Sequence, residues 1–308
     1  MTSAQLARLA MILGALLLLW GAVSLARRGS QGLSETDRFA LPALTRDSVD
    51  SVIIMRAADT VRLGRRDSAW TVNGHPASGS AVQQLFGALA DTARRTELVG
   101  TRPGSHGGFG VDSAKGTRIR IVRGDSMVAD LVQGNRGPSL EGGYFRLAAD
   151  SSVYLVGGDL AEALEQSSEE WRDRRIAGVS EDSVGLIEVT RGRRAYTIRR
   201  DSTAWSLVPG GRADSAAVAE LLAAYREVEA ADFASRAEAD SAQLARPDRR
   251  VRLLRKDGTP LLALAFDSTA NGFWVQAAGD STVYRLDTWT ADRLAPADST
   301  LKTKPAAS

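Results

Sequence analysis

The sequence predicts an α+β protein built from two tandem repeats, each a mainly antiparallel β-sheet packed by helices. Three observations predict this class. Segments of the first half recur in the same order in the second half, alternating polar and apolar residues mark strands, and a helical stretch occupies the same place in both halves. The chain has 308 residues, 44% of them hydrophobic and 25% charged, which suffices for two domains that each close a core.

The internal duplication is visible as short matching segments. The matching pairs are residues 50–54 and 182–186, 66–70 and 200–205, 80–86 and 214–222, 117–125 and 249–258, 143–147 and 272–276, and 150–154 and 280–284. Because all pairs keep the same order along the chain, we infer that one unit has been duplicated. Each unit is expected to run strand, strand, strand, helix, then four strands and a short helix.

Local patterns support these elements. Residues 117–123 alternate polar and apolar, which predicts a strand with one buried and one solvated face. In the second helical stretch Ala217 and Leu221 lie on one apolar stripe at helical spacing. Asp214 and Ser215 precede that stripe and are candidate N-caps of the helix.

An apolar segment precedes the repeats. Residues 9–26 carry no charge, and as a helix they are long enough to cross a bilayer core of about 30 Å. The run exceeds the about 7–15 apolar residues of a signal peptide. It therefore predicts a retained transmembrane anchor after a short tail of residues 1–8. Cleavage after Ser24-Leu25-Ala26 is the alternative.

The orientation of this anchor involves a conflict. Arg27 and Arg28 follow the apolar segment, and the positive-inside rule would place the following domain in the cytoplasm. Large domains nevertheless translocate largely regardless of charge. One anchor after a short amino tail is also the usual form of an exported protein. We therefore predict a single-pass inner-membrane protein whose C-terminal part is extracytoplasmic, in the periplasm.

These features divide the rest of the chain. We expect a linker over residues 27–47, repeat unit 1 over residues 48–166, a connecting helix over residues 167–177, repeat unit 2 over residues 178–294 and a disordered tail over residues 295–308. The linker mixes Gly, Ser, Thr and charges, and its Leu-Pro step interrupts any regular element. The tail is small, polar and contains proline, which is typical of disorder.

Metal and catalytic chemistry find little support in the sequence. The chain has no cysteine and two histidines. His75 follows Asn-Gly in a turn and His106 lies in a glycine-rich loop, and neither has a second ligand at metal-binding spacing. The glycines of residues 100–110 lack the Gly-Lys-Ser/Thr of a P-loop and the G-x-G-x-x-G of a dinucleotide site. We therefore predict no catalytic, cofactor-binding or metal-binding residue, and a protein that is not an enzyme.

Two further classes of ligand are disfavoured. Asp-Ser pairs recur along the chain, but none is followed by the Gly and closing Glu of a calcium loop, and both residues favour turns and caps. The formal net charge is only +2, with acids and bases mixed rather than gathered in blocks. Nucleic-acid binders usually concentrate positive charge on one face or arm, so we expect no nucleic-acid partner.

Large aromatic side chains recur at matching positions of the two units. Trp70 matches Trp205, and Tyr154 matches Tyr284. Duplicated large side chains predict two equivalent cores, with a stacking platform for sugar rings as the alternative for the tryptophan pair.

Two adjacent pairs of aromatic residues are the best candidates for partner contacts. Tyr144 and Phe145 occupy the same segment of unit 1 that Phe273 and Trp274 occupy in unit 2, with Phe145 matched to Trp274. Successive side chains of a strand point to opposite faces, so one ring of each pair is expected to face outward. We therefore predict that the outward rings among Tyr144, Phe145, Phe273 and Trp274 contact a partner.

Several short motifs resemble those of one family. Phe109-Gly110-Val111-Asp112 is similar to a Y-G-L-D element, residues 142–145 and 153–155 close the first unit, and Trp171-Arg172-Asp173-Arg174-Arg175-Ile176, similar to an L-R-D-K element, opens the second. With the apolar segment ahead of them, these motifs make residues 50–290 resemble the bacterial domain-of-unknown-function family DUF4340. The second unit departs from the pattern, with Gln243-Leu244-Ala245-Arg246-Pro247 where Y-G-L-D would fall.

The resemblance implies a membrane-tethered envelope protein without known catalytic residues, and some relatives are encoded beside ABC-type transporter components linked to gliding. We therefore expect a non-catalytic interaction or scaffold module whose partners are the membrane, through its N-terminal helix, and a protein such as an ABC-transporter component. The alternative is a ligand-binding module that takes a glycan or peptide in the groove between the repeats. An enzyme of unrecognised type, with a site assembled from separate segments, is the third hypothesis.

Overall fold

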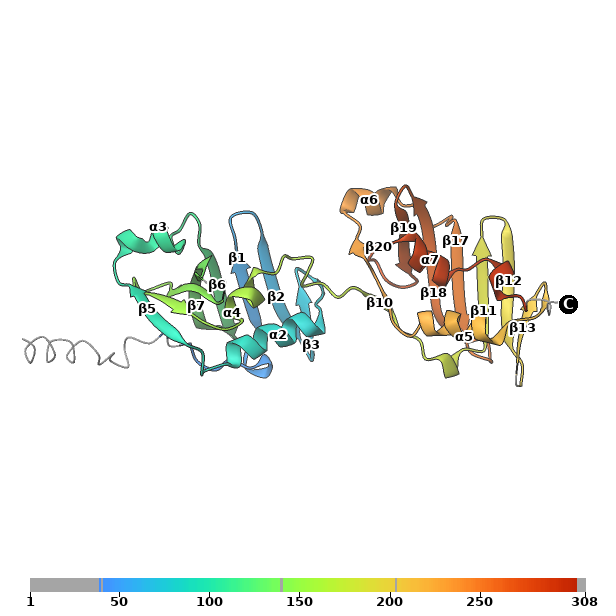
Figure 1. The fold of residues 1–308 in the computed structure, drawn as a ribbon, viewed down its shortest axis with the longest axis horizontal. Coiled ribbons are helices and arrows are strands. Elements are labelled where there is room, and N and C mark those ends of the chain that lie inside the picture. Colours follow the sequence, from blue (N-terminus) through green and yellow to red (C-terminus); the bar gives the residue numbers. More distant parts are fainter. Residues whose placement is uncertain (1–38, 40, 139–140, 203, 304–308) are drawn as a thin grey trace, which may run out of the picture. The chain divides into compact units, whose positions relative to one another are not determined.

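The computed structural model describes residues 39, 41–138, 141–202 and 204–303, which form two compact units divided between Arg172 and Asp173 (Figure 1). Each unit contains one nine-stranded antiparallel sheet with helices packed on it. The predicted α+β class with mainly antiparallel sheets is confirmed.

Unit 1 contains the first sheet. Its strands are β1 (Ser51–Met55), β2 (Thr60–Arg66), β3 (Ala69–Val72), β4 (His75–Pro76), β5 (Thr96–Gly100), β6 (Thr117–Arg123), β7 (Ser126–Arg136), β8 (Gly143–Leu147) and β9 (Val153–Val156). Its helices are α2 (Gly79–Ala90), α3 (His106–Phe109) and α4 (Leu160–Glu165), with 3-10 turns η2 (Arg46–Ser48) and η3 (Pro103–Ser105).

Unit 2 contains the second sheet. Its strands are β11 (Leu186–Arg191), β12 (Arg194–Arg200), β13 (Trp205–Val208), β14 (Gly211–Arg212), β16 (Asp232–Phe233), β17 (Arg249–Leu254), β18 (Pro260–Thr269), β19 (Gly272–Ala277) and β20 (Tyr284–Leu286). The helices are α5 (Ser215–Ala224), α6 (Arg236–Ser241) and α7 (Thr288–Leu294), with η4 (Glu181–Ser183) and η5 (Asp298–Leu301), and β10 (Arg175–Ala177) pairs with β15 (Val228–Glu229).

The two sheets have the same topology, so the predicted duplication is confirmed. The strand order is β4-β3-β2-β1-β6-β7-β8-β9-β5 in unit 1 and β14-β13-β12-β11-β17-β18-β19-β20-β16 in unit 2. These orders coincide when each strand is replaced by its counterpart along the chain. Beyond the expected elements, each unit adds a two-residue strand after its third strand, an edge strand and a short helix, α3 or α6.

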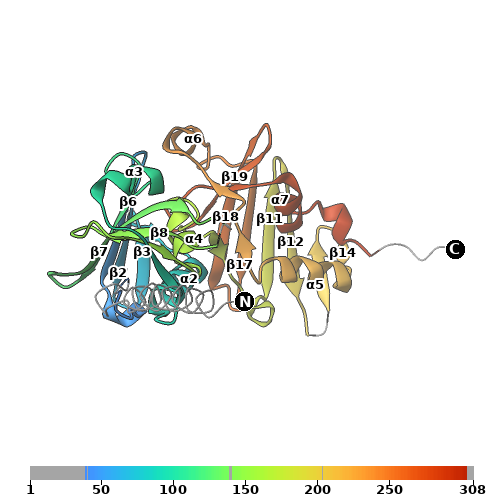
Figure 2. The same cartoon turned by 60° about the vertical axis from the view of Figure 1, so that its left-hand side comes forward.

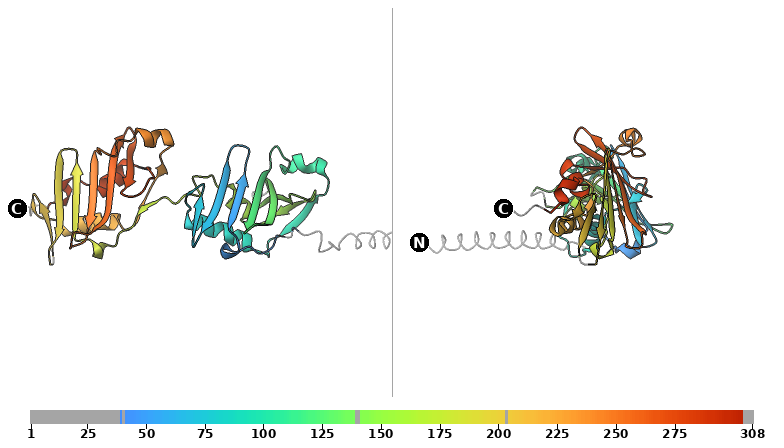
Figure 3. Two further views of the ribbon diagram at one scale, coloured as in Figure 1. Left: turned by 180° about the vertical axis from the view of Figure 1, so that it is seen from behind. Right: turned by 90° about the vertical axis from the view of Figure 1, so that its right-hand side faces the viewer.

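Helices cover one face of each sheet. Figures 1 and 2 show α2 and α4 on one face of the first sheet, and α5 and α7 on the corresponding face of the second. We call this the inner face, because the large hydrophobic cluster of each unit lies there. Seen from behind, the central strands of both sheets carry no helix (Figure 3). We call this second side the outer face.

Capping and turn residues explain where the elements begin and end. The Ser78 side chain accepts a hydrogen bond from the Ala81 amide at the start of α2. Asp214 accepts from two amides at the start of α5, as its sequence position predicts. Between β3 and β4, Asn73 (φ 48°) and Gly74 (φ 89°) form the tight turn, since both adopt the left-handed conformation such a hairpin needs.

The segment predicted as a connecting helix over residues 167–177 is not helical. Residues 168–171 form a turn, and β10 follows. Trp171 does not open unit 2: it is fully buried in the core of unit 1, and its carbonyl accepts from the Ser78 amide at 2.8 Å. An antiparallel bridge between Ala77 and Arg172 completes this closing contact. Burial of the indole therefore outweighs the helix propensity of the neighbouring residues and fixes the segment in a non-helical conformation.

The tail predicted to be disordered over residues 295–308 is ordered as far as the structure describes it, to residue 303. Leu301 is 2% exposed within the core of unit 2, and its carbonyl accepts from the Asp214 amide at 2.9 Å. A bridge joins Ala213 to Lys302. This is the same closing contact that Trp171 makes in unit 1, so the tail is the second copy of that segment.

The segment predicted as a linker over residues 27–47 also belongs to the fold where it is described. Phe39, Leu41 and Leu44 are buried in the core of unit 1. The Leu44 amide donates to the Leu89 carbonyl, as the Val179 amide donates to that of Tyr225 in unit 2. The apolar residues of the segment are thus anchored on the helix of their own unit.

The predicted membrane anchor, residues 9–26, lies outside the described residues. Among the residues that are described, no helix is long and apolar enough to cross a membrane.

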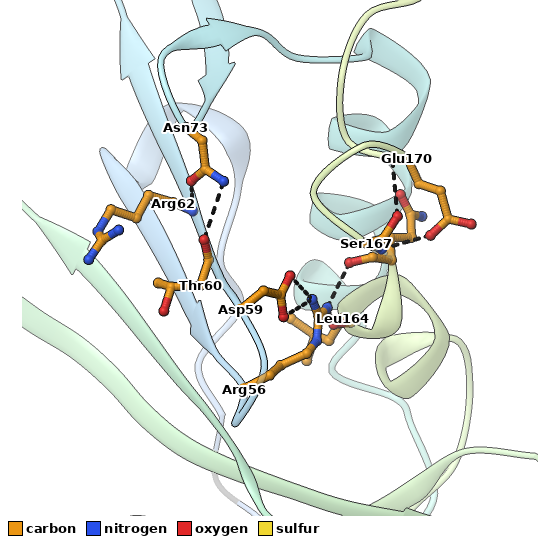
Figure 4. Close-up of polar contacts among 9 residues, drawn as sticks. Arg56, Asp59, Thr60, Arg62, Asn73, Leu164, Ser167 and Glu170 are labelled. Carbon is orange, nitrogen blue, oxygen red and sulfur yellow. Dashed lines mark hydrogen bonds and ion pairs between the residues drawn. The ribbon is translucent and has the colours of Figure 1, made fainter. Parts of the chain in front are cut away.

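The carbonyls that end the last helix of each unit are satisfied by different donors in the two units. In unit 1 the Arg56 guanidinium donates to the carbonyls of Leu164 at 2.8 Å and Gln166 at 2.6 Å, while it pairs with Asp59 at 3.2 Å (Figure 4). In unit 2 the corresponding carbonyls, those of Leu294 and Pro296, accept from two tyrosine hydroxyls. The duplicated backbone has therefore kept its acceptors while the donors have changed.

Candidate functional site

Three of the four aromatic residues predicted to contact a partner are buried. Phe145 is 0% exposed, Phe273 is 7% exposed and Trp274 is 8% exposed. Tyr144 is half-buried, and its ring lies against that of Phe109 at a centroid distance of 4.8 Å. The structure therefore does not bring these rings together as an exposed surface.

The sequence match between residues 143–147 and residues 272–276 is wrong by one residue, which explains much of this result. In the structure Phe145 faces Tyr154 across the sheet, and Val275 faces Tyr284, so Phe145 is equivalent to Val275 rather than to Trp274. Tyr144 and Trp274 are then equivalent, and both point to the outer face. A slip of one residue moves each side chain to the opposite face of a strand. Phe273 consequently points into the core.

The duplicated tryptophans and tyrosines are core residues, as predicted. Trp70 is 4% exposed and lies 5.0 Å from the Phe86 ring, and Trp205 is 9% exposed. Tyr154 and Tyr284 are also buried. Burial, and then the hydrogen bond that its hydroxyl donates to Asp280, raise the pKa of Tyr284 to about 12. Each of these large side chains packs in the core of its own unit.

The outer face of the first sheet carries a group of arginines, and we take it as the candidate site. Its outward positions, which alternate with the buried residues of β2, β6, β7 and β8, hold five arginines and one acid: Arg62, Arg66, Arg118, Arg120, Arg146 and Asp130. The face is therefore basic.

Three of these arginines already have partners. Arg118 donates two hydrogen bonds to Asp130, at 2.9 and 2.6 Å, and holds the pKa of that carboxyl below its usual value. Arg120 lies 3.8 Å from the same carboxylate. Arg146 donates to backbone carbonyls, among them that of Val111 at 2.9 Å. These contacts fix the β6–β8 side of the face.

Arg62 and Arg66 differ from them. Both are exposed on β2, and neither guanidinium forms an ion pair with any residue that the structure describes. Figure 4 shows the Arg62 side chain pointing away from the helices, opposite to Arg56. The neighbouring Arg65 is already neutralised by Asp50, at 2.5 Å. The Gly124 amide, followed by Arg65, lowers the pKa of Asp50.

A shallow hollow of about 540 Å³ lies between the two free arginines. Its lining includes Arg62, Gly64, Arg66, Ser51, Thr71 and Asn73. Gly64 forms its floor at the centre of β2, where the sheet face lacks a side chain. We call this feature the Gly64 hollow.

Nothing in the fold itself requires glycine at position 64. Its φ is not in the left-handed region, and a Cβ placed there would meet only the Thr71 hydroxyl oxygen, at an ordinary 3.7 Å. Glycine inside a strand lowers stability, and it often marks a place where a ligand or another backbone comes close. Apart from the Thr71 hydroxyl, no atom of the described chain lies within 4 Å of that Cβ position, so the space over Gly64 is open to solvent.

The central residues of the Gly64 hollow are replaced in unit 2. Strand pairing makes Arg199 equivalent to Gly64, and Thr197 and Asp201 equivalent to Arg62 and Arg66. On the same face Glu188 neutralises Arg252 at 2.9 Å. Among the described residues, an open strand position between two outward arginines therefore occurs at this place in unit 1 and is replaced at the equivalent place in unit 2.

The sequence did carry a signal for this hollow. A glycine interrupts the alternating strand pattern of residues 60–66, and outward arginines stand on both sides of it.

Replacing Gly64 with alanine should stabilise unit 1 by about 0.5–1 kcal/mol, because alanine loses less backbone entropy on folding and its methyl group fits the open space. Urea unfolding of the chain would measure this change. Gly142→Ala is the matched control, since its φ of 67° and a clash of the added Cβ with the Val156 carbonyl oxygen make that substitution destabilising. A loss of stability for Gly64→Ala would show that the strand needs glycine there.

The histidines take part in local contacts. His106 Nε2 lies 2.9 Å from the Ser151 carbonyl, and His75 Nδ1 lies 3.5 Å from the Arg172 guanidinium. No cluster of His, Cys, Asp or Glu that could hold a metal ion occurs among the described residues.

Comparison with known proteins identifies the family. No curated protein and no solved structure matches the chain. The profile described as "Domain of unknown function (DUF4340)" matches residues 70–247, more than half of the chain and parts of both units. This span lies inside the residues 50–290 over which the motifs resemble that family. The chain therefore belongs to the DUF4340 family.

Proposed function

We propose that this protein is a non-catalytic interaction module of the bacterial inner membrane, tethered by residues 9–26 with both units in the periplasm. The uncharged length of that segment supports the tether. The predicted alternative, a module that takes a glycan or peptide between the repeats, stays a prediction.

One observation carries the proposal: each sheet has one face covered by helices and one face without them over its central strands. The large aromatic residues fill the cores, whereas several outward positions of the first sheet carry arginines. Arginine is enriched in protein interfaces because its planar, always charged group makes several directed hydrogen bonds. The outer faces are therefore the surfaces through which we expect a partner to bind.

We further propose that the partner is a membrane protein complex such as an ABC-type transporter. A single anchor would hold both units close to such a complex in the same membrane. This raises their effective concentration at the complex, so even a weak contact between the two would form.

Site-specific photocrosslinking of the full chain in membranes tests this function. A photoreactive residue at Thr71 or Thr197, on the outer faces, should give discrete crosslinks to one protein that mass spectrometry identifies as a transporter subunit. The same residue at Gln83, exposed on α2, is the matched control and should not. A C-terminal alkaline phosphatase fusion should be active, as a periplasmic domain requires.

Two results would refute the proposal. The first is the absence of protein crosslinks from every outer-face position while the chain is folded and inserted. The second is an inactive phosphatase fusion together with an active cytoplasmic reporter at the same site.

A further inference from the structure

We propose that the Gly64 hollow of unit 1 binds an extended acidic segment of a partner protein, whose carboxylates pair with Arg62 and Arg66. This inference rests on the proposed interaction function and names the chemistry of the partner. It follows from the charge, the spacing and the shape of the hollow.

The charge around the hollow is positive and largely uncompensated. The nearby acids Asp50 and Asp59 are already engaged, by Arg65 and Arg56. Asp67 lies in the β2–β3 turn with φ 54°. The two free guanidiniums therefore supply the attraction for an acceptor-only group, for which carboxylate is the common choice in proteins.

The other polar groups of the lining are already used. The Thr71 hydroxyl donates to the Gly64 carbonyl at 3.1 Å. The Asn73 side chain accepts from the Arg62 amide at 2.9 Å and donates to the Thr60 carbonyl at 3.2 Å (Figure 4). These bonds make the hollow rigid and leave recognition mainly to the arginines.

The spacing favours a polypeptide over a single small anion. Arg62 and Arg66 are four residues apart on one strand, which places their Cα atoms about 13 Å apart. An extended chain that carries acidic residues at alternate positions repeats its carboxylates on one side about every 6.7 Å, so every second carboxylate matches the spacing of the two arginines. Two such carboxylates would reach both guanidiniums while the side chain between them enters the space over Gly64.

The second unit is a natural comparison for this site. Arg199 fills the position of Gly64, and Asp201 replaces one of the two arginines. An acidic segment would meet a filled surface and a like charge there. Binding should therefore be confined to unit 1 although both units share one fold.

Fluorescence anisotropy with the full chain in nanodiscs of zwitterionic lipid tests the site. The probe is a labelled peptide of alternating Glu and Thr, and the same peptide with Gln in place of Glu is the uncharged control. We expect the acidic peptide alone to bind, more weakly at higher salt. The double substitution Arg62→Gln/Arg66→Gln should weaken binding by about tenfold, and Gly64→Leu, which fills the hollow without changing charge, should weaken it similarly.

The matched control is Arg199→Gln/Arg250→Gln, which removes the same charge from the outer face of unit 2 and should leave the affinity unchanged. Thermal unfolding of each variant checks that the fold is kept. Equal affinity of the wild type and the Arg62→Gln/Arg66→Gln variant for the acidic peptide would overturn the inference. Binding to anionic vesicles that needs these two arginines, without peptide binding, would overturn it as well, because the ligand would then be a lipid surface.

The two proposals fail in different ways. If Thr71 crosslinks to a partner but the acidic peptide does not bind, the interaction function stands and its assignment to acidic segments is wrong. If the peptide binds but no outer-face position crosslinks to a protein in membranes, the site exists without the proposed function.

Discussion

Replacing Trp171 with alanine should destabilise unit 1 by about 3–5 kcal/mol, a large fraction of the about 5–15 kcal/mol of a typical domain, and should leave the stability of unit 2 unchanged. The indole is fully buried in the cluster that also contains Phe86. Its removal would create a large cavity, and the cost of such cavities rises with their volume. The loss would also loosen the bond between the Ser78 amide and the Trp171 carbonyl, which closes the unit.

Hydrogen exchange followed by mass spectrometry would measure this effect unit by unit. In Trp171→Ala the strands β1, β2 and β6 should lose protection, while β11, β12 and β17 should keep it. Leu301→Ala is the matched variant, because Leu301 makes the same closing contact in unit 2, and it should give the reverse pattern. Loss of protection in unit 2 on replacing Trp171 would show that this segment belongs to the second unit after all.

The duplication was predictable because it rests on strand and turn patterns that are read locally. Buried residues alternate along β6 and along its counterpart β17 up to the bulge at its end, and turn residues stand between the strands. A repeated order of such patterns requires a repeated topology, and the two sheets have it. The N-cap of α5 was predictable for the same reason, because the Asp214 carboxylate accepts hydrogen bonds from amides only two and three residues away.

The flanks of the repeats were missed because their order comes from contacts distant in sequence. Residues near Leu44 and Leu301 have the small, polar, proline-containing composition of linkers and tails. Each flank is held by a few apolar side chains that enter a core formed elsewhere. Local propensity does not report that burial, so only the folded unit shows it.

The candidate site was missed for a different reason. The size of an aromatic side chain is visible in the sequence, but the face of the sheet on which it lies depends on a strand register that a shift of one residue reverses. The Gly64 hollow is defined by an absent side chain between Arg62 and Arg66, and its openness depends on strand pairing. Pairing is not visible in one sequence.

Replacing Arg56 with methionine should destabilise unit 1 by about 2–4 kcal/mol. The Arg56 side chain is 19% exposed and bonds at once to the Asp59 carboxylate and to two carbonyls at the C-terminal end of α4. Methionine keeps most of the aliphatic stem but donates no hydrogen bond, so those carbonyls lose partners in a partly buried place. Bonds from a charged donor are stronger than neutral ones, which makes this loss larger than that of a typical surface ion pair.

Urea unfolding with hydrogen exchange in α4 would measure the effect. Tyr225→Phe is the matched variant, because the Tyr225 hydroxyl is a neutral donor to the corresponding carbonyl of Leu294 in unit 2. Its loss should cost about 1–2 kcal/mol, with reduced protection confined to α7.

Asp59→Asn separates the two roles of Arg56: it weakens the ion pair and leaves both carbonyl bonds in place, so it should cost less than Arg56→Met. If Asp59→Asn costs as much as Arg56→Met, the ion pair rather than the carbonyl bonds stabilises the end of α4. The idea that both units need donors for the carbonyls at the end of their last helix would then be wrong.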